Sequence, residues 1–213
     1  PGQKIQLVNS GVKNAVDYDH TGKIMQFEVT ADPFDAANNT VPAVLGLPHS
    51  AMQLTPAQAR AKRYMRVERT NSIWTINGQT WKDVENGDYN PIFANPQPGD
   101  VEIWDIENKS GGWFHPVHIH FVDFQVVSRN GKPPRPEEKG PKDVVYVGEG
   151  ETVRLLMQFS KPDGYHGRYM IHCHNLSHED HDMMTQFQIG AHDADCDPIN
   201  TAPPKTGTPP VWS

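Results

Sequence analysis

Residues 170–184 read MIHCHNLSHEDHDMM, and this stretch decides what fold and what site the chain can build. It holds four histidines and one of the chain's two cysteines, and it ends on two adjacent methionines. A second motif, HPVHIH at residues 115–120, precedes it, and the two motifs together contain most of the histidines that lie close to another histidine. Imidazole, thiolate and thioether groups are ligands for transition metals. The sequence therefore predicts a metal centre.

Side chains alternate between the two faces of a β-strand, and this divides the candidate ligands into two sets. In a strand that ends near His174, Cys173 points away from the face that its neighbours share. If residues 118–124 also form a strand, His118 and His120 share a face, while Pro116 sets His115 apart. The first set is His118, His120, His172 and His174. The second set is His115, Cys173, His178 and either Met183 or Met184.

The two sets predict different chemistry. Two imidazoles, one thiolate and a weak axial thioether are typical of a blue-copper electron-transfer site, whereas imidazoles alone suit copper, zinc or iron, with copper favoured by affinity. A structural zinc site is one alternative, but such sites usually take four ligands, commonly paired cysteines. A packed His–Cys core pair is another, which the clustering of histidines disfavours. His181 is expected to stay outside both sets, because better-spaced residues fill them.

The rest of the chain has the pattern of an all-β protein. Short runs rich in β-branched and aromatic residues, one of them spanning residues 118–129, are separated by Asn-Gly, Pro-Gly and Gly-Gly turns. About eight such strands predict a β-sandwich with Greek-key connections. Two insertions, residues 81–100 and 131–142, are expected to be long loops on this sandwich.

Four parts are expected along the chain. Residues 1–31 contain two strands that can pair, and residues 32–62 form a linker with a short helix that begins at Thr55-Pro56 and runs to Lys62. Residues 63–191 form the sandwich, and residues 192–213 form a polar, proline-rich tail.

The amino-acid composition limits the classes of partner that the chain is expected to bind. The net charge of −7, with no local cluster of lysine and arginine, disfavours nucleic acid. No apolar run approaches the length of roughly 18 residues that a membrane span requires. Small molecules or other proteins are the expected partners. Cys196 has no evident partner in this chain, and a free thiol and a disulfide to another segment both stay open.

HPVHIH followed by HCHNLSHEDHDMM resembles the C-terminal copper-binding half of the multicopper oxidases, which include laccases and bilirubin oxidases. The ending HEDHDMM and the upstream WTINGQTW and VEIWDIEN most resemble the branch of bacterial spore-coat laccases and bilirubin oxidases. The resemblance covers residues 63–190 and implies a cupredoxin-like fold, with residues 1–31 as the terminal strands of a preceding cupredoxin domain.

The resemblance also implies a role for each candidate residue. The ligands of a mononuclear type 1 copper are His115, Cys173, His178 and Met183, because the family places the axial residue ten positions after the cysteine. His118 resembles the ligand of the type 2 copper, and the ligands of the paired type 3 coppers are His120, His172 and His174. Glu179 resembles an acidic residue that delivers protons to the resulting trinuclear cluster.

The implied activity is that of a copper-dependent oxidoreductase. Small organic donors, such as phenols, aromatic amines or bilirubin-like compounds, lose one electron at a time beside an exposed edge of His115 or His178. Electrons pass through Cys173 to its neighbours, and O2 is reduced to water at the trinuclear cluster. The alternative is a stand-alone blue-copper electron-transfer protein without oxidase activity, for which the imidazole set would have no use.

The resemblance implies that the chain is incomplete as a catalyst. The family's cluster is held by eight histidines, and this chain supplies His118, His120, His172 and His174. An N-terminal portion of the same oxidase is therefore the expected partner, and the four coppers belong to the complete enzyme. The chain begins without Met in strand-like sequence, which we interpret as a cut within the second of three domains. An extracellular, periplasmic or spore- or cell-surface location is favoured over the cytoplasm.

Overall fold

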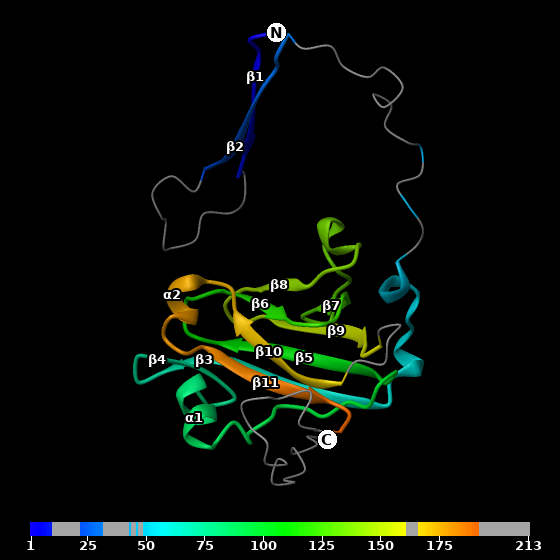
Figure 1. The fold of residues 1–213 in the computed structure, drawn as a ribbon, viewed down its shortest axis with the longest axis vertical. Coiled ribbons are helices and arrows are strands. Elements are labelled where there is room, and N and C mark those ends of the chain that lie inside the picture. Colours follow the sequence, from blue (N-terminus) through cyan, green and yellow to red (C-terminus); the bar gives the residue numbers. More distant parts are fainter. Residues whose placement is uncertain (10–21, 32–42, 44–45, 47–48, 161–165, 192–213) are drawn as a thin grey trace. The chain divides into compact units, whose positions relative to one another are not determined.

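The structure is a computed structural model, and it describes residues 1–9, 22–31, 43, 46, 49–160 and 166–191 (Figure 1). The chain divides into two compact units, residues 1–47 and 48–213, and each unit is described by itself. No helix within the described part of the chain is long and apolar enough to cross a membrane.

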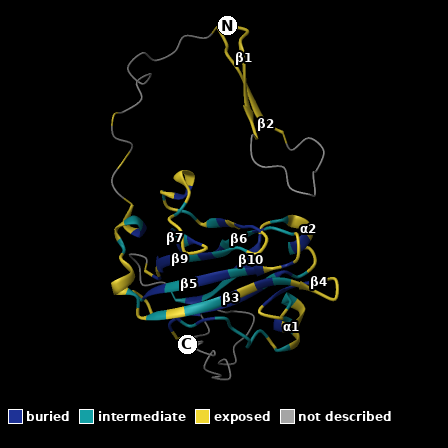
Figure 2. Cartoon of the chain, turned by 180° about the vertical axis from the view of Figure 1, so that it is seen from behind, coloured by how far each residue is buried: buried dark blue, intermediate teal, exposed yellow. Residues whose placement is uncertain are grey.

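The first unit contains one antiparallel hairpin, formed by β1 (Lys4–Val8) and β2 (Lys23–Glu28). Over Lys4–Leu7 the pairing register puts apolar side chains on one face and polar side chains on the other, because successive residues of a strand point to opposite faces. The apolar face carries Ile5, Leu7, Met25 and Phe27, all of which are exposed (Figure 2). The hairpin matches the strand pair expected near the start of the chain.

The second unit is a sandwich of two sheets. The five-stranded sheet has the order β4-β3-β5-β9-β7. Its strands are β3 (Ala61–Thr70), β4 (Ile73–Ile76), β5 (Val101–Lys109), β7 (Phe124–Arg129) and β9 (Thr152–Gln158). The four-stranded sheet has the order β11-β10-β6-β8. Its strands are β6 (His115–Ile119), β8 (Val144–Val147), β10 (Gly167–Cys173) and β11 (Met184–Ile189). The expected all-β sandwich is confirmed.

Apolar side chains from both sheets form the core, and Figure 2 colours much of the strands of this unit as buried. Trp104 from the five-stranded sheet contacts Phe187 from the four-stranded sheet, with ring centroids 5.7 Å apart and the rings nearly perpendicular. Phe159 lies 5.5 Å from the same indole ring. Burying an aromatic side chain of this size contributes about 2–3 kcal/mol to folding. This core holds the ends of β6 and β10 in a fixed register.

The strand expected over residues 118–129 is two strands. β6 ends at Ile119, and β7 begins at Phe124 in the other sheet. Between them Phe121 has a φ of +74°, in the left-handed region where a strand cannot continue. His120 therefore follows β6 and is not part of it. The prediction failed because the run stays apolar while the chain crosses from one sheet to the other.

A helix also interrupts the insertion that was expected to be a loop. Helix α1 (Trp81–Asn86) begins after Thr80, whose side chain accepts a hydrogen bond from the backbone N–H of Asp83. The Asp83 carboxylate accepts one in return from the Thr80 backbone N–H at 2.9 Å. This reciprocal capping stabilises the first turn. The Thr-x-x-Asp spacing was the signal in the sequence that predicts this helix.

The remaining helices are short. The linker segment contains the 3-10 helices η2 (Ser50–Gln53) and η3 (Pro56–Gln58), so the helix expected to reach Lys62 ends at Gln58 and β3 has already begun at Ala61. The second insertion contains η4 (Pro136–Glu138). Helix α2 (Leu176–Glu179) follows directly after β10.

The turn between β3 and β4 is strained at Ser72. Asn71 and Ser72 have φ values of +51° and +67°, which a two-residue hairpin turn of the I′ type requires. Asn tolerates this region, but Ser does so at a cost that Gly avoids. We expect Ser72→Gly to raise the free energy of unfolding by about 1 kcal/mol. Chemical denaturation measures this change, and Ser72→Ala, which keeps the strain, should give no gain.

Candidate metal centre

The candidate ligands gather where β6 and β10 pair. The two strands are antiparallel, with His172 opposite His118 and Cys173 opposite Val117. His115 lies three positions before His118 in β6, so it points to the opposite face. Pro116 does not set His115 apart, because both residues belong to β6 and continue the ladder with β8. Alternation therefore places His115 with Cys173 on one face and His118 with His172 on the other.

The first group is a triangle of buried donor atoms from His115, Cys173 and His178. Cys173 Sγ lies 3.5 Å from His115 Nδ1 and 3.6 Å from His178 Nδ1, and the two Nδ1 atoms lie 3.2 Å apart. The point equidistant from the three atoms lies about 2.0 Å from each, near ordinary metal–nitrogen bond lengths. His115 is fully buried and His178 is 2% exposed. The group can hold one metal ion in a trigonal arrangement.

Burial sets the protonation of this group. It lowers the pKa of His115 to about 3, and it lowers the pKa of His178 to about 4 with a further contribution from the positive charge of Arg69. Both imidazoles are therefore neutral at neutral pH and have a lone pair to donate. Burial raises the pKa of the Cys173 thiol to about 12, although the backbone N–H of Asn175 acts in the opposite direction. A bound cation would displace the thiol proton and take its place.

Two polar residues, linked by hydrogen bonds, orient the His115 ring from the side opposite the thiol. Ser110 Oγ lies 2.6 Å from His115 Nε2, and we assign the proton to Nε2 so that Nδ1 faces the thiol. The fully buried Asn108 accepts a hydrogen bond from the Ser110 backbone N–H at 2.9 Å and donates to the carbonyl of Trp113 at 2.7 Å. A hydrogen bond to the other ring nitrogen is how proteins orient metal-binding histidines. The sequence offered no signal for these two residues.

Met183 reaches the first group through its backbone. Its carbonyl accepts a hydrogen bond from the Cys173 N–H at 3.1 Å, and its N–H donates to the His178 carbonyl at 3.2 Å. Its side chain is fully buried in the core. Met184 instead begins β11 opposite His172. The main chain thus ties Met183, and not Met184, to two members of the triangle.

The second group lies on the other face and consists of His118, His120 and His172. The Nε2 atoms of His120 and His172 face each other at 3.2 Å. His118 Nδ1 lies 2.8 Å from the Asp143 carbonyl, which leaves its Nε2 free for a metal. His174 is exposed at the edge of the group, with its ring centroid 5.5 Å from that of His172 and 5.8 Å from that of His118.

Glu179 joins the second group from α2. Its Oε1 atom lies 3.4 Å from His172 Nδ1. Burial lowers the pKa of His172, whereas the negative charge of Glu179 raises it. The carboxylate therefore contacts the ring nitrogen that points away from the other imidazoles. His181 belongs to neither group, and Cys196 lies outside the described residues.

The exposed edge expected for a trigonal-site histidine is absent at His115, which is fully buried, and is very small at His178, which is 2% exposed. Trp74 stacks on His178 with ring centroids 3.9 Å apart and an interplanar angle of 29°. Trp113 approaches the same imidazole edge-on at 5.6 Å. Sequence reasoning missed this cover, since the two tryptophans come from different parts of the chain.

Comparison of this chain with models of protein families agrees with the geometry of the two groups. The family model described as "Multicopper oxidase" matches residues 53–193, which is more than half of the chain. The chain belongs to the multicopper oxidase family.

Individual multicopper oxidases are similar over most of this chain. The bilirubin oxidase of Albifimbria verrucaria is 40% identical over 195 residues, which cover 87% of this chain and 32% of that protein. The laccase of Bacillus subtilis is 31% identical over 209 residues, covering 88% of this chain and 39% of that protein. The crystal structure of McoA from Aquifex aeolicus matches with a TM-score of 0.65 at 33% identity, over 79% of this chain and 36% of that one. The cupredoxin-like fold is thereby confirmed.

This multicopper oxidase chain spans about a third of the length of such relatives, since it covers 28–39% of the first four curated proteins that it matches. Copper is the cofactor that the family implies. The donor sets fit it: the triangle offers the two imidazoles and one thiolate of a blue-copper site, and the second group offers the imidazoles that bind copper well.

Proposed function

We propose that this chain is the C-terminal part of an oxidase that couples one-electron oxidation of small organic donors to the reduction of O2. Four donor molecules supply four electrons, and O2 takes up four protons to give two molecules of water. Phenols, aromatic amines or bilirubin-like compounds are the proposed donors. The observation that carries the proposal is the pair of residue groups that could each hold a metal ion, which lie on opposite faces of β10 and are joined by consecutive residues.

Each candidate ligand has a proposed role. The type 1 copper site consists of His115, Cys173, His178 and Met183, of which the first three form the triangle of donor atoms. His118 belongs to the type 2 site, and the type 3 pair uses His120, His172 and His174. Copper, when bound, supplies one-electron redox chemistry at the first site and O2-reducing chemistry at the second. Because Cys173 is bonded through the main chain to His172 and His174, the backbone of β10 links the two sites.

The imidazole group is proposed to be completed by an N-terminal portion of the same oxidase. The exposed position of His174 supports this, because a ligand at the edge of a group leaves that side open to another domain. The hairpin of β1 and β2 supports it as well, since a two-stranded hairpin with one exposed apolar face is marginal in water by itself. We propose that residues 1–31 belong to a preceding cupredoxin domain, 32–62 to a linker and 63–191 to the C-terminal cupredoxin domain.

Copper content tests the proposal. The complete oxidase that contains this chain should bind four copper ions per assembly, measured by atomic absorption after removal of loosely bound metal. One copper per assembly would instead support a blue-copper electron carrier and overturn the proposed oxidase activity. We also propose a location outside the cytoplasm, which fractionation of the producing cells tests.

Glu179 is proposed to orient His172 and to supply protons to the O2-reducing site. It is the carboxylate that contacts an imidazole of the second group, and it comes from α2, between the two sites. We expect Glu179→Gln to lower the turnover number roughly tenfold or more, within the range of general acid catalysis. The visible absorption of the type 1 site should persist, because the triangle is intact.

The neighbouring exposed residue provides the control for this variant. Asp180→Asn removes a carboxylate one position away in sequence and should leave turnover unchanged. O2 consumption at saturating donor measures both variants. Equal losses in the two variants would mean that general surface charge, and not the contact with His172, accounts for the effect.

A further inference from the structure

The main chain around Met183 is held by hydrogen bonds from several residues. The Met183 N–H donates to the His178 carbonyl at 3.2 Å, and the Met183 carbonyl accepts from the Cys173 N–H at 3.1 Å. The residues on either side of Met183 close a three-residue turn, because the Met184 N–H donates to the Asp182 carbonyl at 2.8 Å. The direction of the Met183 side chain therefore depends on how this turn is held.

The turn begins at a residue with a strained backbone. Asp182 has a φ of +65°, in the left-handed region that Gly enters at no steric cost and other residues enter only at a cost. Strain of this kind persists where the surrounding contacts determine the conformation. One such contact lies within the loop, since the Asp182 N–H donates to the Glu179 carbonyl at 2.9 Å. A second contact comes from a distant part of the chain.

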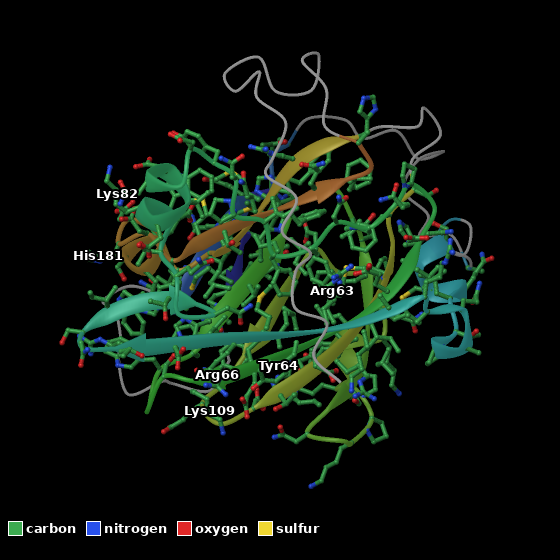
Figure 3. The ribbon with its side chains drawn as sticks, turned by 90° about the horizontal axis from the view of Figure 1, so that it is seen from below. Arg63, Tyr64, Arg66, Lys82, Lys109 and His181 are labelled. Carbon is green, nitrogen blue, oxygen red and sulfur yellow. The ribbon has the colours of Figure 1, made fainter. Side chains whose placement is uncertain are left out.

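Helix α1 supplies this second contact. The backbone N–H of Trp81 donates to the Asp182 carbonyl at 2.8 Å, so this one oxygen accepts from both Trp81 and Met184. Trp81 is the first residue of α1, and the N–H of a first helical residue has no acceptor within its own helix. Figure 3 labels Lys82 and His181, which are sequence neighbours of the two bonded residues and lie close to each other in that view.

The sequence fixes where Trp81 lies relative to the five-stranded sheet. β4 is followed by a two-residue turn at Asn77 and Gly78, whose φ values are +53° and +76°. Thr80 comes soon after this turn and caps α1 together with Asp83. β4 belongs to the five-stranded sheet, whereas β11, which follows the Met183 turn, belongs to the four-stranded sheet. The hydrogen bond from Trp81 therefore connects the two sheets beside the metal-binding triangle.

We propose that Trp81, through its backbone N–H, is a positioning residue for Met183 and thereby sets the reduction potential of the type 1 site. The inference rests on the proposed role of Met183 as the axial ligand. A thioether that donates to the metal stabilises the oxidised ion, so a more distant axial ligand raises the potential. Without the bond to α1, the strained turn at Asp182 relaxes and Met183 is no longer held at one distance. The insertion that contains α1 thus acts on the site without contributing a ligand.

Trp81→Pro tests this role, because it removes the donor from the main chain. Proline is accepted at the first position of a helix, and Thr80, with φ −104° and ψ 168°, has the extended conformation that suits a residue before proline. Trp81→Ala is the matched control, since it loses the same indole and its contact with Tyr89 but keeps the N–H. In the complete, copper-loaded oxidase, Trp81→Pro should raise the type 1 reduction potential, measured by redox titration of the visible absorption. Trp81→Ala should keep the wild-type potential.

Hydrogen exchange of the metal-free oxidase tests the positioning by itself. The amides of Met183 and Met184 should exchange roughly fivefold faster in Trp81→Pro than in Trp81→Ala, as expected for the loss of one backbone hydrogen bond. Thr80→Ala weakens the cap of α1 but keeps the Trp81 N–H, so it should shift the potential and the exchange rate in the same direction by less. This variant decides the result if circular dichroism shows that Trp81→Pro does not fold.

The possible outcomes separate this inference from the proposed function. Equal potentials in Trp81→Pro and Trp81→Ala, with the visible absorption intact in both, would overturn the positioning role alone, whether or not exchange becomes faster. Equal rises in both variants would assign the effect to the indole and would overturn the role of the N–H as well. Absence of the type 1 absorption from the copper-loaded wild type would overturn the proposed function and the inference with it.

Discussion

Replacing Cys173 by serine is expected to abolish both the visible absorption of the type 1 site and the oxidase activity. Cys173 Sγ is the one sulfur of the triangle, and it lies within 3.6 Å of both imidazole Nδ1 atoms. Thiolate ligation distinguishes a blue-copper site from an ordinary imidazole site. A serine hydroxyl is a far weaker acid than the buried thiol, whose pKa is already raised to about 12, so it does not become an anionic ligand. Visible spectroscopy and O2 consumption measure the two losses.

The loss should be confined to one face of β10. Cys173 points toward the core, whereas His172 faces the second group beside His120. We therefore expect Cys173→Ser to lower the copper content of the complete oxidase by one ion and to retain the other three. Electron paramagnetic resonance should still detect the type 2 copper. A loss of all four ions would mean that the variant fails to fold, which circular dichroism checks independently.

Cys196→Ser is the matched control, because it makes the same substitution at the chain's other cysteine, outside both histidine motifs. It should keep the absorption and the activity. An intense thiolate-to-copper band in Cys173→Ser would show that Cys173 is not the sulfur ligand. That result would remove the central assignment of the site.

The part of the site that could be predicted from the sequence depends on the alternation of side chains along a strand. His172, Cys173 and His174 are consecutive, so strand alternation alone assigns them to two faces, and the pairing of β10 with β6 puts matching imidazoles opposite. The closeness of His178 to Cys173 also follows from a short connection. His178 belongs to α2, which begins soon after Cys173 and ends before Asp180. Both inferences concern residues that are close in sequence, so a local pattern is enough to make them. Whether each residue binds copper in the role proposed for it stays a prediction.

The cover of the site was beyond sequence reasoning because it depends on packing between distant segments. Trp74 and Trp113 belong to β4 and to the loop before β6, and nothing in the local pattern indicates that both rings reach His178. The break at Phe121 was missed for a related reason. The sequence stays apolar where the chain leaves one sheet for the other, so no change in its pattern marks the end of the strand. Helix α1 did have a local signal, the Thr80 and Asp83 capping pair, which the surrounding proline and glycine residues outweighed.

The largest change in stability is expected for Arg129→Met, which breaks a buried ionic network. Arg129 is 6% exposed and donates to the carboxylates of Glu138 and Glu151 and to the carbonyl of Tyr146. These contacts attach the insertion between β7 and β8 to the sandwich. Burial alone would raise the pKa of Glu138, but hydrogen bonds from Arg129 and from the Arg135 backbone hold that pKa below its usual value. The Glu138 carboxylate is therefore charged and depends on the guanidinium, whereas Glu151 also pairs with Arg135.

Removal of one partner from a buried pair costs about 3–5 kcal/mol, because the remaining charge is left without compensation. Arg129→Met should lower the free energy of unfolding by this amount, measured by denaturant titration. The matched control is Lys82→Met, which breaks the exposed pair with Glu85 in α1 (Figure 3) and should not change the unfolding midpoint measurably. If the two variants lose equally little stability, water must reach Glu138 and Glu151 readily, and the network does not anchor the insertion. A large loss of stability confined to Arg129→Met, with type 1 absorption retained, would show that this ionic network stabilises the domain independently of its metal sites.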